Sequence, residues 1–266
     1  MPDQTRPRIL AVTNQKGGVG KTTTAINLGA ALAELGERVL IIDLDPQGNA
    51  STGLGISARD RDNTTYELLL EDAPLASVIR QTGVERLDIA PATTDLSSTD
   101  VELGNAENRV FLLKDALSSE VLLTYDQVLI DCPPSLSLLT VNALVACDAV
   151  LVPLQAEFFA LEGLSQLMLT VRDVRETANP GLRIEGVVLT MYDQRNNLSQ
   201  QVEADARATL GELVLQTRIP RNVRLSEAPS YALPVLAYDP ASKGSQAYME
   251  LAEELLARHA KRKEPA

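Results

Sequence analysis

The chain has 266 residues, which is long enough for one large domain with a well-buried core. Hydrophobic residues make up 45% of it and charged residues 23%, ordinary values for a globular protein, and no segment approaches the ~20 consecutive apolar residues of a membrane-spanning helix. The formal net charge of -12 excludes attraction of the whole molecule to nucleic acid, so any contact with DNA would need a local basic patch.

In chain order, residues 1–7 are expected to be a short N-terminal extension, because they lack the apolar run of a signal peptide. Residues 8–258 are expected to form the domain and residues 259–266 a frayed basic tail. The two cysteines, Cys132 and Cys147, lack the spacing of metal ligands and fit a reducing compartment. We therefore expect a cytoplasmic protein.

Short apolar segments alternate with helical segments along the domain. The expected buried strands are Ile9–Val12, Val39–Ile42, Leu87–Ala90, Val128–Ile130, Ala149–Val152 and Gly186–Leu189. The expected helices include Lys21 to about Leu35, Tyr66–Leu70, about Asn108–Leu123 and about Gln246–His259, while residues 47–61 are expected to be loop-like. This alternation predicts the α/β class: a single domain with a mostly parallel twisted sheet and helices on both faces.

The turn between the first strand and the first helix reads N-Q-K-G-G-V-G-K-T-T over residues 14–23. Such a glycine-rich turn directs backbone N–H groups at phosphate oxygens, and the helix N-terminus adds a positive dipole. Lys21 is expected to contact the β- and γ-phosphates, Thr22 to bind Mg²⁺, and Thr23 to reach the α-phosphate. The alternative is a turn that binds nothing, but two lysines would then repel each other with no anion between them. The expected phosphate-binding residues are Lys16, Gly17, Gly18, Val19, Gly20, Lys21, Thr22 and Thr23.

Acidic residues follow two other strands at the same edge of the expected sheet, where ligands of parallel sheets bind. Asp43 and Asp45 follow the second strand, and Asp131 ends the strand at residues 128–130 in the position of a Walker B carboxylate. Thr22, Asp45, Asp131 and phosphate oxygens would form an all-oxygen ligand set that suits Mg²⁺. The alternative for each carboxylate alone is a helix cap or a strand-end turn.

The run K-G-G-x-G-K-T-T resembles the signature of the deviant Walker ATPases, which include ParA/Soj, MinD, the arsenite-pump ATPases and the nitrogenase iron protein. It departs from the standard P-loop pattern at Gln15, where glycine is usual, and it adds Lys16. The resemblance implies that Lys16 reaches across an ATP-bound sandwich homodimer to the partner subunit's nucleotide. It also implies that Asp45 positions the attacking water, so that Lys16, Lys21 and Asp45 are the expected catalytic residues.

Further runs are similar to ParA/Soj in particular: residues 47–55, 158–163, 189–193 and 219–230. Within the last run the resemblance implies that Pro220 and Asn222 lie against the adenine of ATP, with Met191 nearby. It also implies that a ParB-type centromere-binding protein stimulates hydrolysis. Only seven residues precede Arg8, so the N-terminal helix-turn-helix domain of larger plasmid ParA proteins is not expected.

The segment from residue 183 to 244 is neutral, with seven basic and seven acidic residues, so the net negative charge comes from the remainder of the chain. The resemblance implies that ATP-bound dimers bind double-stranded DNA nonspecifically through this side of the fold, which would make the protein nucleoid-associated. The residues that match this role are Arg195, Arg221, Arg224 and Lys243. The alternative reading makes them surface ion-pair partners.

Three other functions are compatible with the same scaffold. A MinD-like membrane-associated positioning ATPase is the main alternative, but the tip at residues 258–263 offers no bulky apolar side chain for insertion, so no membrane partner is expected. An iron–sulfur reductase would need a glycine-rich frame around Cys147, which is absent. A metabolic ligase would need a substrate pocket that no motif indicates. The sequence therefore predicts a DNA-partitioning ATPase.

Overall fold

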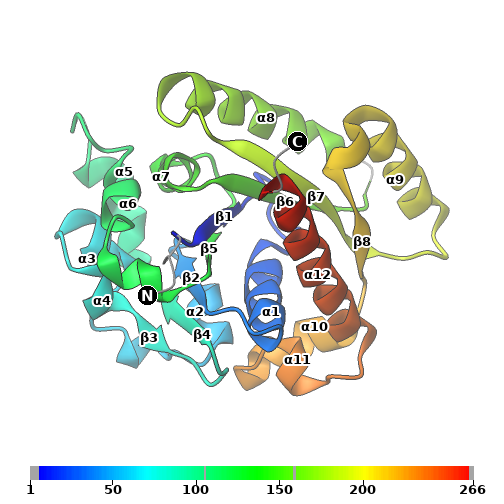
Figure 1. Cartoon of the computed structure of the whole chain (residues 1–266), viewed down its shortest axis with the longest axis horizontal. Helices are drawn as coiled ribbons and strands as arrows, with labels where there is room; N and C mark the ends of the chain where they lie inside the picture. The colour runs from blue at the N-terminus through cyan, green and yellow to red at the C-terminus, as the bar shows by residue number, and fades with distance from the viewer. Residues whose placement is uncertain (1–5, 105, 158–159, 264–266) are drawn as a thin grey trace.

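The computed structural model describes residues 6–104, 106–157 and 160–263, and its centre is one eight-stranded sheet (Figure 1). The strand order is β3-β4-β2-β5-β1-β6-β7-β8, and all neighbours run parallel except β3 and β4. The α/β class with a mostly parallel sheet is confirmed. The strands are β1 (Arg8–Val12), β2 (Val39–Asp43), β3 (Arg80–Gln81), β4 (Leu87–Ala90), β5 (Gln127–Asp131), β6 (Ala149–Gln155), β7 (Arg183–Tyr192) and β8 (Val214–Pro220).

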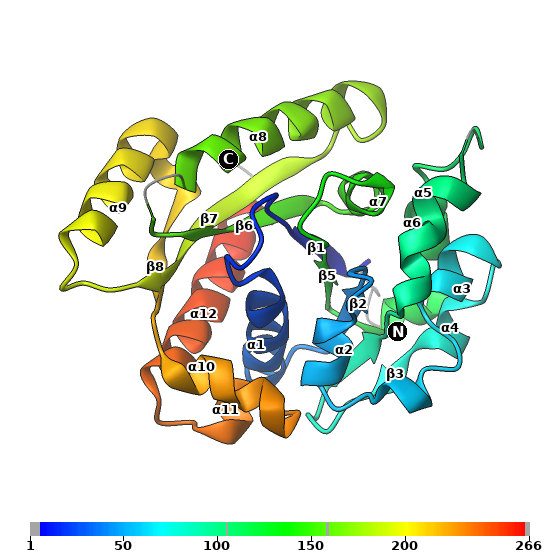
Figure 2. The ribbon, with the colours of Figure 1, turned by 180° about the vertical axis from the view of Figure 1, so that it is seen from behind.

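Helices cover both faces of the sheet, as Figures 1 and 2 show from opposite sides. Side chains of β1 alternate between two hydrophobic clusters: Ile9 and Ala11 belong to one cluster, and Leu10 belongs to the other. The first cluster contains α7 and α8, whereas the second contains α1 and α12. The helices are α1 (Lys21–Glu34), α2 (Asn49–Gly53), α3 (Thr65–Leu70), α4 (Leu75–Val78), α5 (Thr99–Glu102), α6 (Leu112–Ala116), α7 (Leu138–Ala146), α8 (Ala160–Thr177), α9 (Asn197–Leu210), α10 (Val223–Glu227), α11 (Val235–Tyr238) and α12 (Lys243–Lys263).

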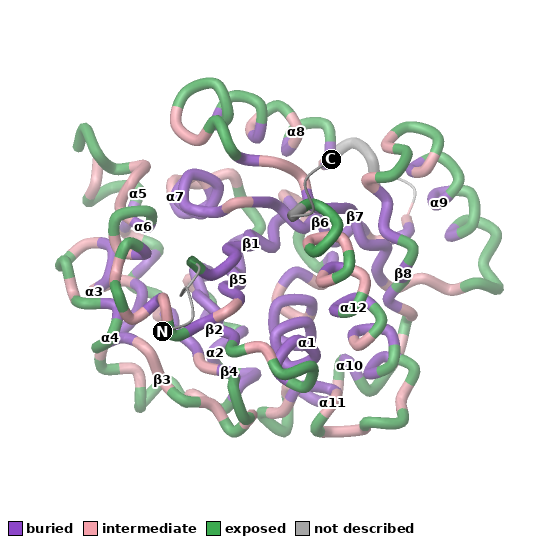
Figure 3. The backbone as a smooth tube through the Cα atoms, viewed as in Figure 1, coloured by how far each residue is buried: buried purple, intermediate pink, exposed green. Residues whose placement is uncertain are grey.

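Burial follows this layering, with the central strands and α1 buried and the outer helices exposed on their outer sides (Figure 3). Strands β1, β2 and β5 are buried along their whole length, because helices cover both of their faces. Among the described residues, no helix is both long and apolar enough to cross a membrane.

Two of the sequence predictions about local structure are wrong. Residues 47–61 are not only loop: α2 begins after Gly48, whose φ of 59° starts the turn, and a 3₁₀ turn follows at Ala58–Asp60. The helix expected over residues 108–123 is confined to α6 and a 3₁₀ turn at Glu120–Thr124, because Ser119 is extended (φ -70°, ψ 140°) and interrupts the helical backbone. The last helix, by contrast, is longer than expected and extends to Lys263.

Candidate nucleotide and magnesium site

The glycine-rich turn lies at the carboxyl edge of the sheet, between the end of β1 and the start of α1. Gly18 (φ 76°) and Gly20 (φ 89°) adopt the left-handed conformation that favours glycine, and α1 begins directly after Gly20. Asn14 anchors the turn, since its amide donates to the Pro153 carbonyl at 2.8 Å and its side-chain oxygen accepts from the Lys16 N–H at 3.1 Å. The turn is therefore held open at the N-terminus of a buried helix, where an anion is stabilised.

Lys21 is only 6% exposed, and its ammonium donates to the Lys16 carbonyl at 3.1 Å. Burial lowers the pKa of Lys21, while Asp131, Cys132 and Asp45 act in the opposite direction. A phosphate bound in the turn would add the negative charge that this buried ammonium partly lacks. The Lys21 ammonium therefore lies within hydrogen-bond distance of the backbone of the turn itself.

Asp131 is fully buried at the end of β5, and among the described residues its carboxylate oxygens make no hydrogen bond of normal geometry, although the Thr22 hydroxyl is close enough to lower its pKa. Burial raises the pKa of Asp131 well above its usual range, and Asp43 and Asp45 raise it further, whereas Thr22 and Lys21 act against them. A buried carboxylate without a partner is costly unless a cation is supplied. The donor set therefore fits a magnesium ion.

Side chains of the described residues do not by themselves make up a full set of metal ligands. The described part of the chain contains no group of three or more His, Cys, Asp or Glu side chains that could hold one. Thr22 and Asp131, with Asp45 from the loop after β2, would thus bind Mg²⁺ together with phosphate oxygens of the nucleotide, as is usual for this ion. This arrangement implies that metal and nucleotide bind together.

Asp43, the last residue of β2, and Asp45, in the loop after it, have different hydrogen-bond partners. Asp43 is fully buried and accepts hydrogen bonds from the Ser51 N–H at 2.9 Å, the Ser51 hydroxyl at 2.6 Å and the Asp45 N–H at 3.1 Å. Burial raises the pKa of Asp43 to about 6, despite those bonds. Asp43 thus fixes α2 against the sheet, and Asp45 is the carboxylate of this pair that the loop presents beyond the strand.

Arg61 holds the same loop in place, a role that no sequence motif indicated. Its guanidinium donates to the carbonyls of Ala92 at 2.8 Å and Gly48 at 3.3 Å, and to the Thr52 hydroxyl at 2.8 Å. One carboxylate oxygen of Asp45 accepts a hydrogen bond from the Gln47 N–H at 3.0 Å. The loop that Arg61 holds in place therefore also orients the Asp45 side chain.

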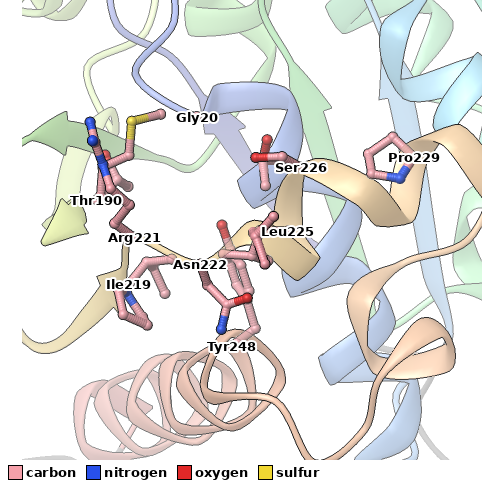
Figure 4. Close-up of a pocket in the computed structure, with 13 residues that line it drawn as sticks. Gly20, Thr190, Ile219, Arg221, Asn222, Leu225, Ser226, Pro229 and Tyr248 are labelled. Atoms are coloured by element: carbon pink, nitrogen blue, oxygen red, sulfur yellow. The ribbon is translucent and has the colours of Figure 1, made fainter.

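A pocket of about 590 Å³ adjoins the glycine-rich turn, and Figure 4 shows the side chains around it. Met191, Pro220 and Asn222, the three residues expected near adenine, all line it together with Gly20 and Thr23. The Asn222 side-chain oxygen accepts the Arg224 N–H at 2.8 Å and caps α10, so the amide group is what Asn222 can offer to a base. The pocket has the size of a small-ligand site.

Two further residues of this pocket and its surroundings escaped the sequence reasoning. Tyr248 of α12 lines the pocket, and its hydroxyl lies 3.2 Å from the Thr24 hydroxyl of α1. Asn27 of α1 donates to the Thr23 carbonyl at 2.7 Å and accepts the Val235 N–H at 2.6 Å. These bonds connect the helix that carries the phosphate turn to the C-terminal segment.

The side chain of Lys16 lies near the ends of β6 and β7. Its ammonium forms an ion pair with Glu157 at 3.4 Å, and both side chains are roughly half exposed. A shallow hollow of about 390 Å³ beside it includes Asp193 and Arg221. The Lys16 ammonium therefore lies at the surface, whereas the Lys21 ammonium is buried in the turn.

The basic residues expected to contact DNA fall into two groups. Arg195, Arg221 and Lys243 line one surface hollow of about 700 Å³, in which Arg195 is ion-paired with Asp193 at 3.2 Å. Arg224 does not line this hollow and forms ion pairs with Glu227 at 2.8 Å and Asp239 at 3.1 Å. Residues 158 and 159 of the ParA/Soj-like run at 158–163 lie outside the described residues.

The doubly covered parallel sheet, the glycine turn opening α1 and the buried carboxylates define a P-loop nucleotide-binding protein. A family model described as an AAA domain matches residues 7–184. The chromosome partitioning protein ParA of Caulobacter vibrioides is 57% identical over 260 residues, covering 97% of each chain. The sporulation initiation inhibitor protein Soj of Bacillus subtilis is 52% identical over 250 residues, covering 94% of this chain and 98% of Soj. The chain belongs to the ParA/Soj family of chromosome-partitioning ATPases.

Among solved structures, the chain is also similar to cobyrinic acid a,c-diamide synthase from Mycobacterium smegmatis with bound ADP and magnesium. That protein is 40% identical, with a TM-score of 0.84 and coverage of 97% of both chains. Its name describes a different chemistry from partition, so the likeness supports the fold and is compatible with more than one activity on it.

Proposed function

We propose that this chain is a partition switch that binds ATP and Mg²⁺, forms a sandwich homodimer, holds double-stranded DNA nonspecifically and hydrolyses ATP when a ParB-type centromere-binding protein stimulates it. The observation that carries the nucleotide part is the fully buried Asp131 carboxylate, whose pKa Thr22 and Lys21 influence, together with a pocket that Gly20 and Thr23 of the same turn line. The partition part rests on 57% identity to a ParA over nearly the whole chain.

The residues of the site divide the work of phosphoryl transfer. Backbone N–H groups of residues 17–23 and the Lys21 ammonium would hold the phosphates, and Asp45 would orient the attacking water. A bound Mg²⁺ would neutralise charge on the phosphate oxygens. Positioning and charge stabilisation of this kind supply most of the catalysis in phosphoryl transfer.

The exposed Lys16 supports a site completed by a second subunit. Its ammonium lies outside its own phosphate turn and is available at the surface beside Glu157. In a face-to-face dimer it would contact the partner subunit's nucleotide and offset charge that develops on the transferring phosphoryl group. A site that depends on correct docking turns over slowly until a partner protein stabilises the active geometry.

Nucleotide-dependent DNA binding is the experiment that tests this function. Binding to random-sequence duplex DNA is measured with no nucleotide, with ADP and with ATP-Mg²⁺. Binding is expected only with ATP-Mg²⁺, because a dimer doubles the hollow lined by Arg195, Arg221 and Lys243. If Arg221 and Lys243 of both subunits each contact a phosphate, affinity falls on the order of 10²-fold between about 50 and 200 mM salt. Absence of DNA binding in every nucleotide state would refute the proposal, and binding to anionic liposomes would then favour the MinD-like alternative.

Arg221 is expected to matter more for DNA binding than Arg224. Arg221 has no carboxylate within ion-pair distance among the residues the structure describes, whereas Arg224 is already neutralised by Glu227 and Asp239. We expect Arg221→Gln to weaken DNA binding of the ATP-bound protein about tenfold and the matched Arg224→Gln variant by no more than about threefold. Fluorescence anisotropy at fixed salt measures both. The reverse order would move the DNA-binding surface to α10.

The C-terminal helix argues against the membrane-associated alternative. Leu251 and Leu255 of α12 are fully buried in the cluster that also contains α1. An amphipathic helix that binds a bilayer must present its apolar face to lipid. The apolar face of α12 is instead part of the core of the domain.

A further inference from the structure

A second groove, of about 660 Å³, lies on the molecule away from the nucleotide pocket, where α1, α11 and α12 meet. Both views of the ribbon place these three helices side by side (Figures 1 and 2). Its floor is apolar and includes Ala30 of α1, Leu236 of α11 and Met249 of α12, with Val84 at one end. Leu236, Met249 and Val84 are only partly buried and pack against the α1–α12 cluster, so they remain accessible from the groove.

The charged side chains that line this groove are all acidic. Glu34 at the end of α1 and Glu250 and Glu253 on α12 line it, and no Lys or Arg is among its lining residues. Within the described ranges, none of these three glutamates lies within ion-pair distance of a basic side chain. The C-terminal end of α1, whose last turn has no basic residue, adds partial negative charge at the same place.

The hollow next to this groove along α12 contains most of the nearby basic side chains. Lys243, at the start of the helix, lines the basic hollow together with Arg195 and Arg221. A hollow lined by several cations therefore adjoins an anionic groove with an apolar floor, and Gln246 and Glu250 lie on the border between them. Polyanions such as DNA or a lipid headgroup layer are repelled from the groove, and a cationic apolar partner is attracted to it.

We propose that this groove docks a short amphipathic segment of a partner protein. Apolar side chains of that segment fill the floor at Leu236 and Met249, and its Lys or Arg side chains pair with Glu34, Glu250 and Glu253. Helices laid into grooves bind in this way, with apolar anchors at helical spacing and charges at the rim that fix register. The groove shares no lining residue with the nucleotide pocket, so a docked segment leaves that pocket free, and it meets the basic hollow only at Gln246 and Glu250 of α12.

A defined peptide tests the groove without any nucleotide or DNA, so the result is independent of the proposed ATPase cycle. The probe is a fluorescent helix-forming peptide of about 16 residues, made of leucine and lysine with the leucines on one face. We expect it to bind the wild-type chain, and the Glu250→Lys/Glu253→Lys variant to bind it about tenfold more weakly or worse. A matching leucine–glutamate peptide is expected not to bind.

The control must account for the overall charge of -12, which attracts any cationic peptide. Asp115→Lys/Glu120→Lys makes the same change in net charge at exposed positions near α6, whose Leu113 belongs to the core cluster on the other face of the sheet. This variant is expected to keep wild-type peptide affinity within about twofold. Equal weakening in both variants, or no binding to the wild type, would overturn the proposal.

Location is checked independently by methyl NMR. Peptide-induced shifts are expected at Leu236, Met249 and Val84, and not at Leu113 on the other face. Shifts spread over the whole surface would also overturn the proposal, because they would show attraction to net charge instead of docking. Thermal unfolding of each variant confirms that the charge changes leave the fold intact.

Discussion

Replacing Asp45 with alanine is expected to abolish ATP hydrolysis while ATP binding persists. Asp45 is 7% exposed, and one carboxylate oxygen accepts the Gln47 N–H while the structure shows no hydrogen bond to the other in the described part of the chain. That second oxygen is free to orient a water molecule. Loss of a group that positions or deprotonates the nucleophile lowers kcat by about 10² to 10⁴-fold. Phosphate release and the dissociation constant for ATP, measured on the same preparation, check both halves of the prediction.

Two comparisons separate catalysis from loop geometry in this experiment. Asp45→Asn keeps an acceptor for the Gln47 N–H but removes the charge, so it is expected to fold like the wild type and to be nearly as inactive as Asp45→Ala. Ser51→Ala removes a hydroxyl of α2 that donates to Asp43, and it leaves the Asp45 side chain and its hydrogen bond from the Gln47 N–H in place. A hydrolysis rate in Asp45→Ala equal to that of the wild type would exclude Asp45 from catalysis, and lost ATP binding would show that the loop had collapsed.

The parts of the molecule that local sequence determines were predicted well. The phosphate turn needs glycines with positive φ followed at once by a helix, and Gly18, Gly20 and α1 show this in the structure. The buried strands were identified because apolar runs of that length fit a sheet covered on both faces. Helix ends were less reliable, since the segment at residues 108–123 has helical periodicity but is interrupted at Ser119.

Residues that act over long separations in sequence were missed. Tyr248 meets Thr24 across 224 positions, and Asn27 meets Val235 across 208. Arg61 bonds to a carbonyl 31 positions away. Each of these side chains has an unremarkable local context, and its role follows only from how α12 and the segment after α2 pack on the sheet. A single sequence contains the residues for these contacts but no local pattern that marks them.

Replacing Lys16 with alanine is expected to prevent ATP-dependent dimer formation while ATP still binds to the single subunit. Lys21 and the backbone of the turn hold the phosphates within the subunit, and Lys16 lies outside them at the surface. If each Lys16 contacts the partner subunit's nucleotide, a symmetric dimer loses two charged contacts of about 2 kcal/mol each, which weakens association about 10³-fold. Sedimentation velocity with ATP-Mg²⁺, in the hydrolysis-deficient Asp45→Ala background, measures the monomer–dimer equilibrium.

The ion pair between Lys16 and Glu157 provides the matched control. Both side chains are about half exposed, and such surface pairs contribute about 1 kcal/mol or less, so breaking this one costs little. Glu157→Gln releases Lys16 from its own subunit and is therefore expected to leave dimer formation unchanged or slightly stronger. If Lys16→Ala dimerises like the wild type while Glu157→Gln does not, the lysine acts within its own subunit, and the proposed contact across the dimer is wrong.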